Sequence, residues 1–476
     1  MSSLVDHLTA SGGSESIGFL NDIVAQLWPN INVAGSDMTK KIAEPMFAEM
    51  LPGPLASLKF VKIDLGKKPM TFHNVDVHKT EHEGIKLDMD LDWDGECDIE
   101  LDGKMVPKVG VEHVKLQGRL SVLLCPLTNV IPLVGAAQVA FINPPSLKLD
   151  FTDAANIADC SIIDKCVRKI MLSIISSMAV IPNRFLVKLD AANDYLKTFQ
   201  YDEGVLRLTV EKASKVVVSK KGGAGGFLSK IIKDTPDCYC KVDFGPEEWK
   251  TSTKKNETDP EWNETKDFLL SDHDQAIFVD VQDDDLAGDD DIGIATTTAK
   301  KILLAGGTEE LTLVHNGSNT SAKLTLNAQL HKFVPDIASF TADDAATEGR
   351  ICGLATVLVA GAFDVKGDRS ELTPSVKITW GDKTFSTAKK SDCPGTDVTN
   401  PSFDSAFRFP IDSEAAGTQP PFNITLLDGG DKVGSVEVPF ADVLAAPEMV
   451  LADKFDIGDG TTVRASFCVR GTELIE

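Results

Sequence analysis

One segment of the sequence gathers more potential metal ligands than any other, because six aspartates crowd together there. They are Asp283, Asp284, Asp285, Asp289, Asp290 and Asp291. Carboxylates packed this closely repel one another by several kcal/mol at a low effective dielectric unless a cation lies between them. Calcium would suit the segment, because it takes roughly six to eight oxygen ligands from a flexible loop. A solvated acidic turn is the alternative, and the residue types alone favour it.

Other residues that often bind metals or perform catalysis give weaker signals. Cys238 and Cys240 have strand spacing, which points both thiols one way, but no second Cys or His pair follows at zinc-site spacing. His78 and His82 would form a metal pair only on a helix, and they lie where a loop enters a strand, so we expect surface histidines. We find no nucleophile elbow, no paired catalytic carboxylates and no kinase or phospholipase signature. The sequence therefore disfavours an enzyme.

The composition is typical of a globular protein with several domains. The chain has 476 residues, 42% hydrophobic and 25% charged, so two or three domains are expected. Its formal net charge of −25 argues against nucleic-acid binding. No apolar run approaches the ~18–20 residues of a membrane-spanning helix. Nine scattered cysteines and an N-terminus without a secretory signal predict a cytosolic protein with reduced thiols.

The first half of the chain is predicted to be a sheet with one apolar face, accompanied by apolar helices. We expect one helix over residues 17–28, with Pro29 as its stop, and a second over 38–50. Strands that each carry one apolar face are expected over 61–65, 85–93, 114–124 and 147–151. A helical segment rich in Ile and Met follows. Such a curved sheet encloses either a packed core or a lipid-sized cavity, and periodicity does not separate the two.

A set of short motifs in the first half of the chain favours the cavity over the packed core, because the motifs resemble those of a known family. The motifs are Phe19-Leu20-Asn21, Trp28-Pro29, Leu65-Gly66, Gly118, Pro126-Leu127, Pro132-Leu133-Val134-Gly135, Pro144-Pro145 and Ile181-Pro182-Asn183-Arg184. In this order they resemble the synaptotagmin-like mitochondrial lipid-binding (SMP) domain of extended synaptotagmins, plant synaptotagmins and tricalbins. The resemblance covers residues 15–200, with Phe19 where that family usually has Trp. It implies a tubular fold that dimerises end to end and carries glycerolipids in an apolar groove between membranes.

The resemblance also makes the apolar face of the sheet a candidate lipid site. The alternation of residues places Val114, Leu116, Leu120, Val122 and Leu124 on one face of a strand. The helical segment expected to cover that face carries Ile170, Ile174 and Met178. In a domain of the SMP type, we expect these side chains to line the lipid groove.

The second half of the chain is predicted to form two all-β sandwiches. Short, evenly spaced strands with turn clusters begin at Gly204, and their order repeats from Gly349. The first copy carries Asp237-Cys238-Tyr239, Asp259-Pro260-Glu261-Trp262-Asn263-Glu264, Asp283-x-Asp285 and Asp289-Asp290-x-Ile292-Gly293. The second copy keeps Asn400-Pro401-Ser402-Phe403 and Leu427-Asp428. Both copies resemble C2 domains.

The C2 resemblance implies a calcium site in the first copy. The residues that match the ligand positions of that family are Asp237, Asp283, Asp285 and Asp290. The aspartate expected in the first loop falls near Lys220, so one ligand is missing, and Asp234 is its candidate replacement.

The second copy departs further from the pattern of a calcium site. Thr373 stands where an aspartate is needed, and a short third loop leaves Asp428 nearly alone. We therefore expect no calcium there. The second copy would then have a structural role, contact another protein, or contact lipid without calcium.

Two groups of residues in the first copy are candidate membrane contacts. An insertion combines basic and apolar residues, and its composition suits a lipid interface: Lys220, Lys221, Phe227, Leu228 and Ile231. A disordered loop, or a patch docked on the SMP-like domain, explains the insertion equally well. A second basic group lies where C2 domains often bind phosphoinositides, although the residue types alone favour a solvated face: Lys250, Lys254 and Lys255.

These observations predict a multidomain protein of the α+β and all-β classes. A tubular SMP-type domain with a curved antiparallel sheet and helices is followed by two C2 β-sandwiches. The expected boundaries are a disordered start at 1–14, the SMP-like domain at 15–200, a calcium-binding C2 domain at 203–333 and a degenerate C2 domain at 349–476.

The predicted function is non-enzymatic transfer of glycerophospholipid between membranes, with calcium docking the first C2 domain on anionic lipids, including phosphoinositides. The alternative is a calcium-regulated tether or scaffold whose SMP-like domain is a packed dimerisation module. A lipid-modifying enzyme is a weaker third hypothesis. By resemblance we expect a homodimer, peripheral on membranes at contacts between the endoplasmic reticulum and the plasma membrane. The chain is also expected to lack the N-terminal membrane anchor of other members.

Overall fold

Two structural units divide the chain after Asn193. In this computed structural model they comprise Met1–Asn193 and Asp194–Glu476. The structure describes residues 14–51, 53–79, 84–152, 157–190, 193–219, 233–284, 290–342, 347–393 and 395–475. The first unit has one main hydrophobic core, and the second has two large ones.

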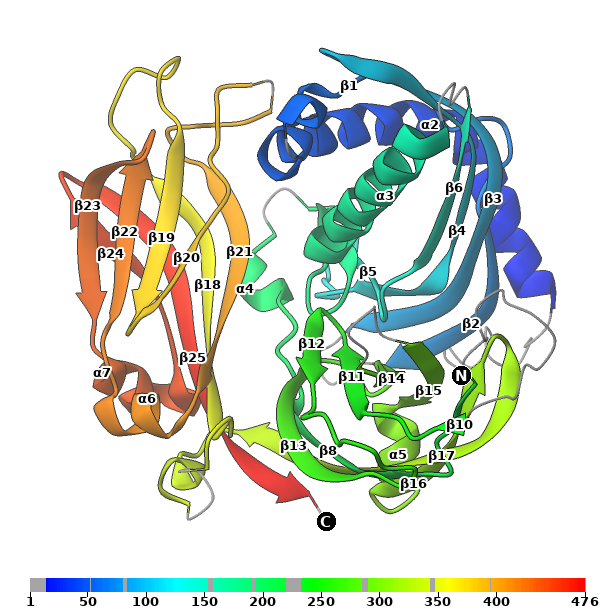
Figure 1. Ribbon diagram of the computed structural model, residues 1–476. Helices are drawn as coiled ribbons and strands as arrows, with labels where there is room; N and C mark the ends of the chain where they lie inside the picture. The colour runs from blue at the N-terminus through cyan, green and yellow to red at the C-terminus, as the bar shows by residue number, and fades with distance from the viewer. Residues whose placement is uncertain are drawn as a thin grey trace. The chain divides into compact units, whose positions relative to one another are not determined.

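The first unit is a curved antiparallel sheet with two long helices (Figure 1). Its helices are α2 (Ser14–Met50), η1 (Gly53–Ser57) and α3 (Ile157–Ala179). Its strands are β1 (Lys59–Asp64), β2 (Thr71–Lys79), β3 (Ile85–Gly103), β4 (Val106–Leu124), β5 (Ala136–Phe141), β6 (Ser146–Thr152) and β7 (Phe185–Lys188). They pair in the order β1-β3-β4-β5-β7, with β2 added on β3 and β6 added on β4.

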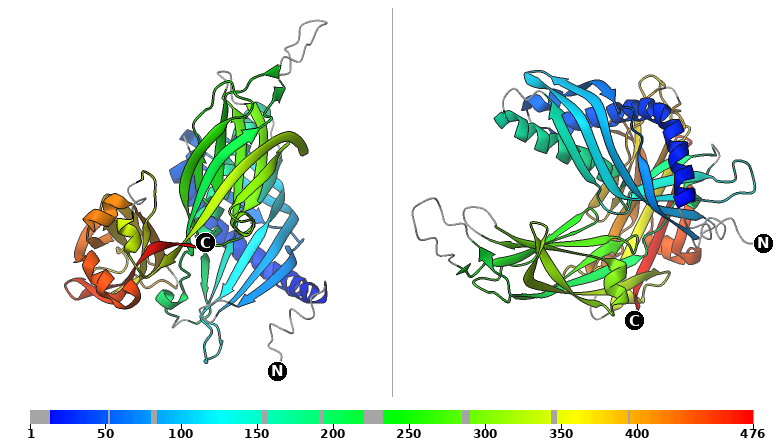
Figure 2. Two further views of the ribbon diagram at one scale, coloured as in Figure 1. Left: turned by 90° about the horizontal axis from the view of Figure 1, so that it is seen from below. Right: turned by 90° about the vertical axis from the view of Figure 1, so that its right-hand side faces the viewer.

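The helix α2 continues through two prolines. The prediction of two helices separated at Pro29 is wrong, because one helix spans Ser14–Met50 with Pro29 and Pro45 inside it. A proline removes one backbone hydrogen bond and crowds the preceding turn, which bends a helix without having to end it. Figure 2 shows the bend. Next to Pro29 in the sequence, the Trp28 indole donates to the Gly66 carbonyl oxygen at 2.9 Å and ties the helix to the loop before β2.

Two glycines of the SMP-like motifs are required by close packing. Gly66 has a φ of 77°, and a Cβ there would lie 1.8 Å from the carbonyl oxygen of Glu96. A Cβ on Gly118 would lie 2.9 Å from the Phe141 ring. Any larger residue at either position would therefore displace the neighbouring strand or ring.

The central hairpin of β3 and β4 is longer than its alternation predicted. The expected strands 85–93 and 114–124 lie within β3 and β4. The pairing register shifts between Glu96 and Ile99, and a bulge of this kind displaces the alternation by one residue. The pattern in the sequence therefore breaks at this point although the pairing continues to Gly103, opposite Val106.

The second unit begins with a short helix and a first β-sandwich. The elements are α4 (Tyr195–Thr198), β8 (Gly204–Ser214), β9 (Val218–Ser219), β10 (Lys233–Asp234), β11 (Cys238–Phe244), β12 (Glu247–Lys250), β13 (Glu261–Leu270), β14 (Ala276–Asp283), β15 (Asp290–Thr298), α5 (Ala299–Leu304), β16 (Thr308–His315) and β17 (Ser318–Val334). One sheet pairs β12-β11-β14-β15 and the other pairs β13-β8-β17-β16. Apolar side chains between them, among them Phe244 and Phe268, form the core.

A second β-sandwich follows in the same unit. The elements are η2 (Ala338–Thr341), β18 (Gly353–Phe363), β19 (Pro374–Trp380), β20 (Lys383–Ser386), β21 (Ser402–Ile411), α6 (Ser413–Thr418), β22 (Phe422–Asp428), β23 (Asp431–Val438), α7 (Phe440–Ala445), η3 (Pro447–Met449), β24 (Val450–Gly458) and β25 (Thr461–Ile475). Its sheets pair β24-β25-β18-β21 and β20-β19-β22-β23. Trp380 stacks on Phe422 and Phe440 at the centre of its core.

The two sandwiches share a continuous sheet. The end of β25 pairs antiparallel with the end of β17, with Gly471 opposite Val334 and Ile475 opposite Leu330 (Figure 1). β17 also pairs with β8 of the first sandwich, and β25 with β18 of the second. Backbone hydrogen bonds therefore join the two sandwiches directly.

Candidate functional site

The apolar face predicted on β4 is one wall of the interior of the first unit. Four of its five side chains belong to one hydrophobic cluster together with all three predicted on α3: Val114, Leu116, Leu120, Val122, Ile170, Ile174 and Met178. The fifth, Leu124, is half-buried at the end of β4, opposite Ala137 of β5. The strand and the helix therefore face the same interior.

This interior is incompletely closed. Twenty of the described hydrophobic side chains packed against its cluster, including Leu116, Val122 and Met178, are only partly buried. The corresponding numbers are three in the first sandwich and seven in the second. Among the buried residues of the cluster that the structure describes, Phe47 alone has no exposed surface. Inward apolar side chains that stay partly accessible are a property of binding cavities, whereas protein cores are close-packed.

Residues outside the predicted set complete this interior. Trp28 of α2 and Trp93 of β3 lie with their ring centroids 5.6 Å apart. Leu147 and Leu149 of β6 lie opposite Leu116 and Val114 of β4. The alternation over 147–151 contained the signal for this leucine pair. No sequence pattern predicts the contact between the two tryptophans, because it depends on the path that the bent helix takes over the sheet.

Two groups of apolar side chains on the first unit are exposed. One group recurs every four residues along α2: Phe19, Ile23 and Leu27, of which Phe19 is 69% exposed. The other lies between β4 and β5: Val130, Ile131 and Leu133, of which Ile131 is 88% exposed. Exposed apolar patches of this kind often mark interaction surfaces. No helix within the described ranges is long and apolar enough to cross a membrane.

Three of the four predicted calcium ligands lie at one end of the first sandwich. Asp237 precedes β11, Asp283 ends β14 and Asp290 begins β15. Asp283 lies opposite Cys238 on one side and opposite Asp290 on the other, so the side chains of Asp283 and Asp290 project from the same face of the sheet. The Asp237 backbone N–H donates to Asp283 Oδ1 at 2.7 Å, and Asp237 Oδ1 accepts the Asn256 N–H at 2.8 Å.

The rest of the predicted site lies outside the described residues. This applies to Asp285 and to Lys220, Lys221, Phe227, Leu228 and Ile231. The backbone of Asp234 lies in β10, opposite Val218. Within the described ranges, no group of three or more His, Cys, Asp or Glu side chains is arranged to hold a metal ion. Calcium takes roughly six to eight oxygen ligands, so Asp237, Asp283 and Asp290 would need others to complete a site.

The Asp-Pro-x-Trp-Asn-Glu motif shapes the loop beside these aspartates. The Trp262 indole donates to the Ser252 carbonyl oxygen at 3.0 Å, and Glu264 accepts the Ser252 backbone N–H at 3.0 Å. Asn263 has a φ of 52° where the register between β13 and β8 shifts. The motif therefore fixes a bulge and a loop.

The three predicted basic residues differ in their surroundings. Lys250 ends β12, and its ammonium lies 3.4 Å from the centre of the Tyr239 ring, a cation–π contact. The Lys254 backbone exchanges two hydrogen bonds of 2.8 Å with Cys238. Lys250 and Lys255 are exposed, whereas Lys254 is half-buried.

Acidic side chains lie on the same sheet face as Lys250. Lys241, opposite Lys250, pairs with Glu248 at 2.9 Å. Burial raises the pKa of both Asp243 and Asp280, which lie on the neighbouring parts of this face. The face is therefore mixed in charge, and the lysines do not dominate it.

The two cysteines of β11 are core residues. Cys238 and Cys240 are both fully buried. Burial raises the pKa of the Cys238 thiol to about 12 and that of Cys240 well above its usual range. A thiol that stays protonated is a poor metal ligand and a poor nucleophile.

The equivalent end of the second sandwich contains a side-chain cation. The Thr373 backbone N–H donates to Asp428 Oδ1 at 2.6 Å. Nearby in the sequence, the Arg369 guanidinium lies 2.9 Å from Asp392 and 3.6 Å from Asp397. Hydrogen bonds from Thr399 and Asn400 lower the Asp397 pKa to about 2, so its carboxylate stays charged.

Charged side chains also tie the two sandwiches together, and the sequence analysis missed them. The fully buried carboxylate of Asp267 in β13 accepts Arg207 Nε at 2.9 Å and Nη2 at 3.0 Å. It also accepts the Ile351 N–H at 2.9 Å and Arg350 Nη1 at 3.4 Å. These partners lie far apart in the sequence and form no motif, so no local signal could have revealed them.

A second set of ion pairs anchors the segment that enters this unit. Asp194 pairs with Arg464 at 2.6 Å, and Asp202 pairs with Arg408 at 2.5 Å. Both arginines belong to the second sandwich, so the segment before β8 is held by the later of the two domains.

Two known domain families match this chain. The synaptotagmin-like mitochondrial-lipid-binding domain matches residues 13–190, and the C2 domain matches residues 204–313 and 353–453. Extended synaptotagmin-3 of Xenopus tropicalis is 29% identical over 283 residues, which are 59% of this chain and 31% of that protein. Extended synaptotagmin-2 of Mus musculus is 24% identical over 485 residues, which are 97% of this chain and 55% of that protein. The chain thus spans only part of these curated relatives.

A solved structure has the same fold. It contains the SMP domain and two C2 domains of extended synaptotagmin 2, and it matches with a TM-score of 0.64 at 22% identity, covering 96% of this chain and 99% of that one. The predicted fold class, an SMP-type domain followed by two C2 β-sandwiches, is confirmed. This chain is therefore an extended-synaptotagmin-like protein, in which one SMP domain precedes two C2 domains.

Proposed function

We propose that this protein binds glycerophospholipid inside its SMP domain and transfers it between membranes. The observation that carries the proposal is the incompletely closed apolar interior, with Leu116 and Val122 on the sheet and Met178 on the covering helix. Each buried methylene of an acyl chain contributes ~0.8 kcal/mol, so the interior can hold a lipid without a chemical step. We accordingly propose a lipid carrier and not an enzyme.

A matched pair of substitutions tests whether this interior holds lipid. Val122→Trp fills the inward face, whereas Lys115→Trp places the same ring on the opposite face of the same strand. Native mass spectrometry of the parent and of Lys115→Trp should show co-purifying glycerophospholipid, and Val122→Trp should lose it. Transfer of a fluorescent phospholipid between liposomes should follow the same order.

The same measurements separate the carrier from a scaffold. If the parent carries no lipid, or if Val122→Trp retains as much as Lys115→Trp, the SMP domain is a packed module. The tether or scaffold would then be the better account of this chain.

We infer further that calcium docks the first C2 domain on anionic membranes. The ligands would be Asp237, Asp283, Asp285 and Asp290. The inference is supported by the match to the C2 family and by the approach of Asp237, Asp283 and Asp290 at one end of the sandwich. Bound calcium would relieve the repulsion among these carboxylates and present positive charge to lipid phosphates.

Calorimetry tests the calcium site. Calcium added to the parent should release or absorb saturable heat, and Asp283→Asn should remove it. Asp243→Asn, on the outer face of the sheet, is the control and should bind as the parent does. An absence of heat from the parent at millimolar calcium would overturn this inference.

Membrane contact by the insertion and by the lysines is a separate proposal. Liposomes containing phosphatidylserine should bind Phe227→Ser/Ile231→Ser more weakly than the parent if the insertion enters the lipid interface. Loss of phosphoinositide binding on replacing Lys250, Lys254 and Lys255 by Gln would support the basic group. Unchanged binding in either case would assign that group to the solvated surface.

We propose a homodimer that is peripheral on membranes at contacts between the endoplasmic reticulum and the plasma membrane. The exposed apolar groups that include Phe19 and Ile131 are candidate surfaces for self-association. Sedimentation of the purified chain should give twice the monomer mass, and Phe19→Glu or Ile131→Glu should reduce it. A monomeric parent would contradict the dimer.

A further inference from the structure

The segment that enters the second unit packs against the second C2 domain, although the first C2 domain follows it in the chain. This segment, residues 194–201, contains α4, and we call it the linker segment. Figure 1 shows α4 beside β18 of the second C2 domain. The first C2 domain begins only afterwards, with β8. The chain therefore contacts its last domain before it forms the first of the two sandwiches.

The surface beneath the linker segment is the outer face of a sheet. Leu358 of β18 lies opposite Ser466 of β25, and Leu358 is not part of the hydrophobic core between the two sheets of this sandwich. Leu358 nevertheless has no exposed surface, and Ser466 is only 2% exposed. An outer face buried to this extent is covered by other residues. The almost continuous apolar run of β18 is typical of a strand that is covered on both faces.

Aromatic rings of the linker segment lie on this face. Tyr195 is 8% exposed and lies near Arg408 of β21, and burial raises its pKa. Tyr201 lies near Ser466 of β25. Phe199 joins the two tyrosines, with ring centroids 6.1 Å from Tyr195 and 5.1 Å from Tyr201 in edge-to-face contacts. Such contacts stabilise aromatic groups beyond the area that they bury.

An ion pair to the second C2 domain lies at each end of the linker segment. Asp194 Oδ2 accepts Arg464 Nη2 at 2.6 Å at its start, and Asp202 Oδ2 accepts Arg408 Nε at 2.5 Å just after its end. The Asp202 carboxylate is fully buried and the Arg408 side chain is 13% exposed, so solvent screens this pair poorly. The Arg408 guanidinium also lies 5.5 Å from the centre of the Phe199 ring, a cation–π contact.

Little chain separates the linker segment from the SMP domain. Within that domain, the Asp190 N–H donates to the Gly135 carbonyl oxygen at 3.0 Å. Residues 191–193 alone lie between Asp190 and the start of the linker segment. If it left the second C2 domain, the eight residues of the linker segment would add up to roughly 26–29 Å of extended chain.

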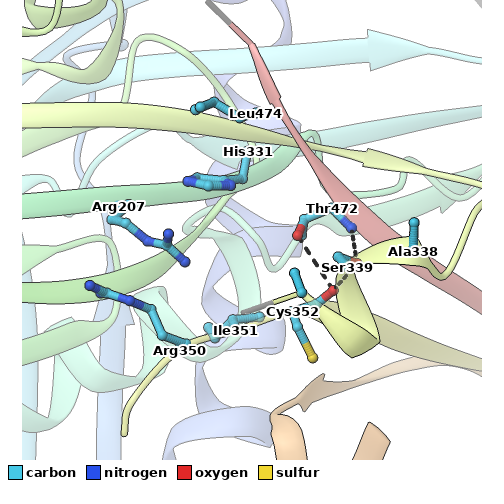
Figure 3. Close-up of a pocket in the computed structure, with 10 residues that line it drawn as sticks. Arg207, His331, Ala338, Ser339, Arg350, Ile351, Cys352, Thr472 and Leu474 are labelled. Carbon is cyan, nitrogen blue, oxygen red and sulfur yellow. Dashed lines mark hydrogen bonds between the residues drawn. The ribbon is translucent and has the colours of Figure 1, made fainter. Parts of the chain in front are cut away.

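The two C2 domains are held to each other at a different place. Figure 3 shows this junction, where Ser339 Oγ donates to the Cys352 carbonyl oxygen at 2.7 Å and accepts the Thr472 N–H at 2.9 Å. The pairing of β25 with β17 joins the same two domains. Release of the linker segment would therefore leave the two sandwiches together.

We propose that the second C2 domain is a clasp for the linker segment, and that the clasp keeps the connection between the SMP domain and the first C2 domain short. The occupant of the outer sheet face is a segment of the same chain. Its rings match the apolar face, and the carboxylates at its two ends match Arg464 and Arg408. This gives a role to the C2 domain in which we expect no calcium. The clasp requires neither bound calcium nor bound lipid.

Limited digestion of the full chain with trypsin tests the clasp, because Lys197 lies within the linker segment. The Lys197 side chain is exposed, so docking of the backbone is what protects the bond after it. The variant Asp194→Asn/Phe199→Ala should be cut after Lys197 at least about tenfold faster than the parent. Asparagine caps a helix as well as aspartate does, so α4 keeps its cap. Leu474→Ala, which shortens an exposed apolar side chain of the same unit, is the control and should be cut as the parent is.

Small-angle X-ray scattering of the full chain measures the length of the connection. The maximum dimension of Asp194→Asn/Phe199→Ala should exceed that of the parent by up to roughly 26–29 Å, and that of Leu474→Ala should not. Arg464→Gln keeps every ring in place and should show both changes to a smaller extent, which preserves the test if loss of the ring unfolds the second sandwich. Cleavage of the parent after Lys197 as fast as that of the variants, or unchanged dimensions of the variants, would overturn the proposal.

Discussion

The interiors of the two structural units differ in how completely they exclude solvent. In the first C2 sandwich, Leu208 and Val279 have no exposed surface, and their neighbours in the core are similarly closed. In the SMP domain, Leu116 and Val122 point inward from the sheet yet remain partly accessible. Both sets come from strands with the same alternation of apolar and polar residues. Alternation therefore identifies the inward face of a strand but not whether protein or lipid fills the space behind it.

The largest expected effect comes from the same truncation made in both interiors. Leu208→Ala should lower the free energy of unfolding by about 3–5 kcal/mol, because it opens a cavity in a closed core. Leu116→Ala should cost only about 1 kcal/mol, because its side chain is already partly accessible. Urea unfolding of the full chain measures both values. Equal costs would remove the distinction between the two interiors.

The second-largest effect concerns the second unit, whose interior excludes solvent more completely. Asp267→Asn should destabilise the second unit by about 3 kcal/mol, because it removes a buried negative charge to which both Arg207 and Arg350 donate. Thermal unfolding of the full chain measures this loss, with Asp243→Asn as a control on a partly exposed carboxylate. If Asp267→Asn lowers the stability no more than the control does, water must reach Asp267 and its partners.

Enlarging a side chain also distinguishes the two interiors, because only the SMP interior has space for a larger one. Val279→Trp should cost about 1–3 kcal/mol or more, because no space is available for the ring. Val122→Trp should change the free energy of unfolding by less than about 1 kcal/mol while it displaces lipid. Chemical denaturation followed by circular dichroism provides the measurement. If Val122→Trp unfolds the SMP domain, its interior is a packed core.

The smallest effect is a pH dependence confined to the second unit. His273 Nε2 lies 2.6 Å from Glu203 Oε2, and this hydrogen bond raises the His273 pKa above its usual 6.5. The resulting stabilisation is fully present below about pH 6.5 and is lost as the pH rises through the raised pKa. Both side chains are substantially exposed, so we expect the melting temperature to fall by only about 1 °C between pH 6 and 8. His273→Gln should abolish that slope, and an unchanged slope would place its cause elsewhere.

The sequence predicted the order of the domains correctly, because that order depends on local patterns and on motifs. It placed five side chains of β4 on one face, and four of them, Val114, Leu116, Leu120 and Val122, belong to one hydrophobic cluster. It misjudged Pro29, because the contact of Trp28 with Gly66 that helps to hold the bent helix joins distant residues. It also indicated Asp237, Asp283 and Asp290 as a group, and the structure places these three at one end of a sandwich. The grouping of Asp267 with Arg207 and Arg350 escaped prediction entirely, since each is an ordinary charged residue until tertiary structure brings them together.

The pairing of β25 with β17 has a consequence for the order in which the chain folds. The first C2 sandwich can form as soon as β17 has been synthesised, but the edge from Leu330 to Val334 then has no partner on its β25 side until the whole second sandwich has emerged. An uncovered strand edge is a template for wrong pairing. During synthesis, therefore, the first sandwich depends on a strand at the far end of the chain for protection against aggregation.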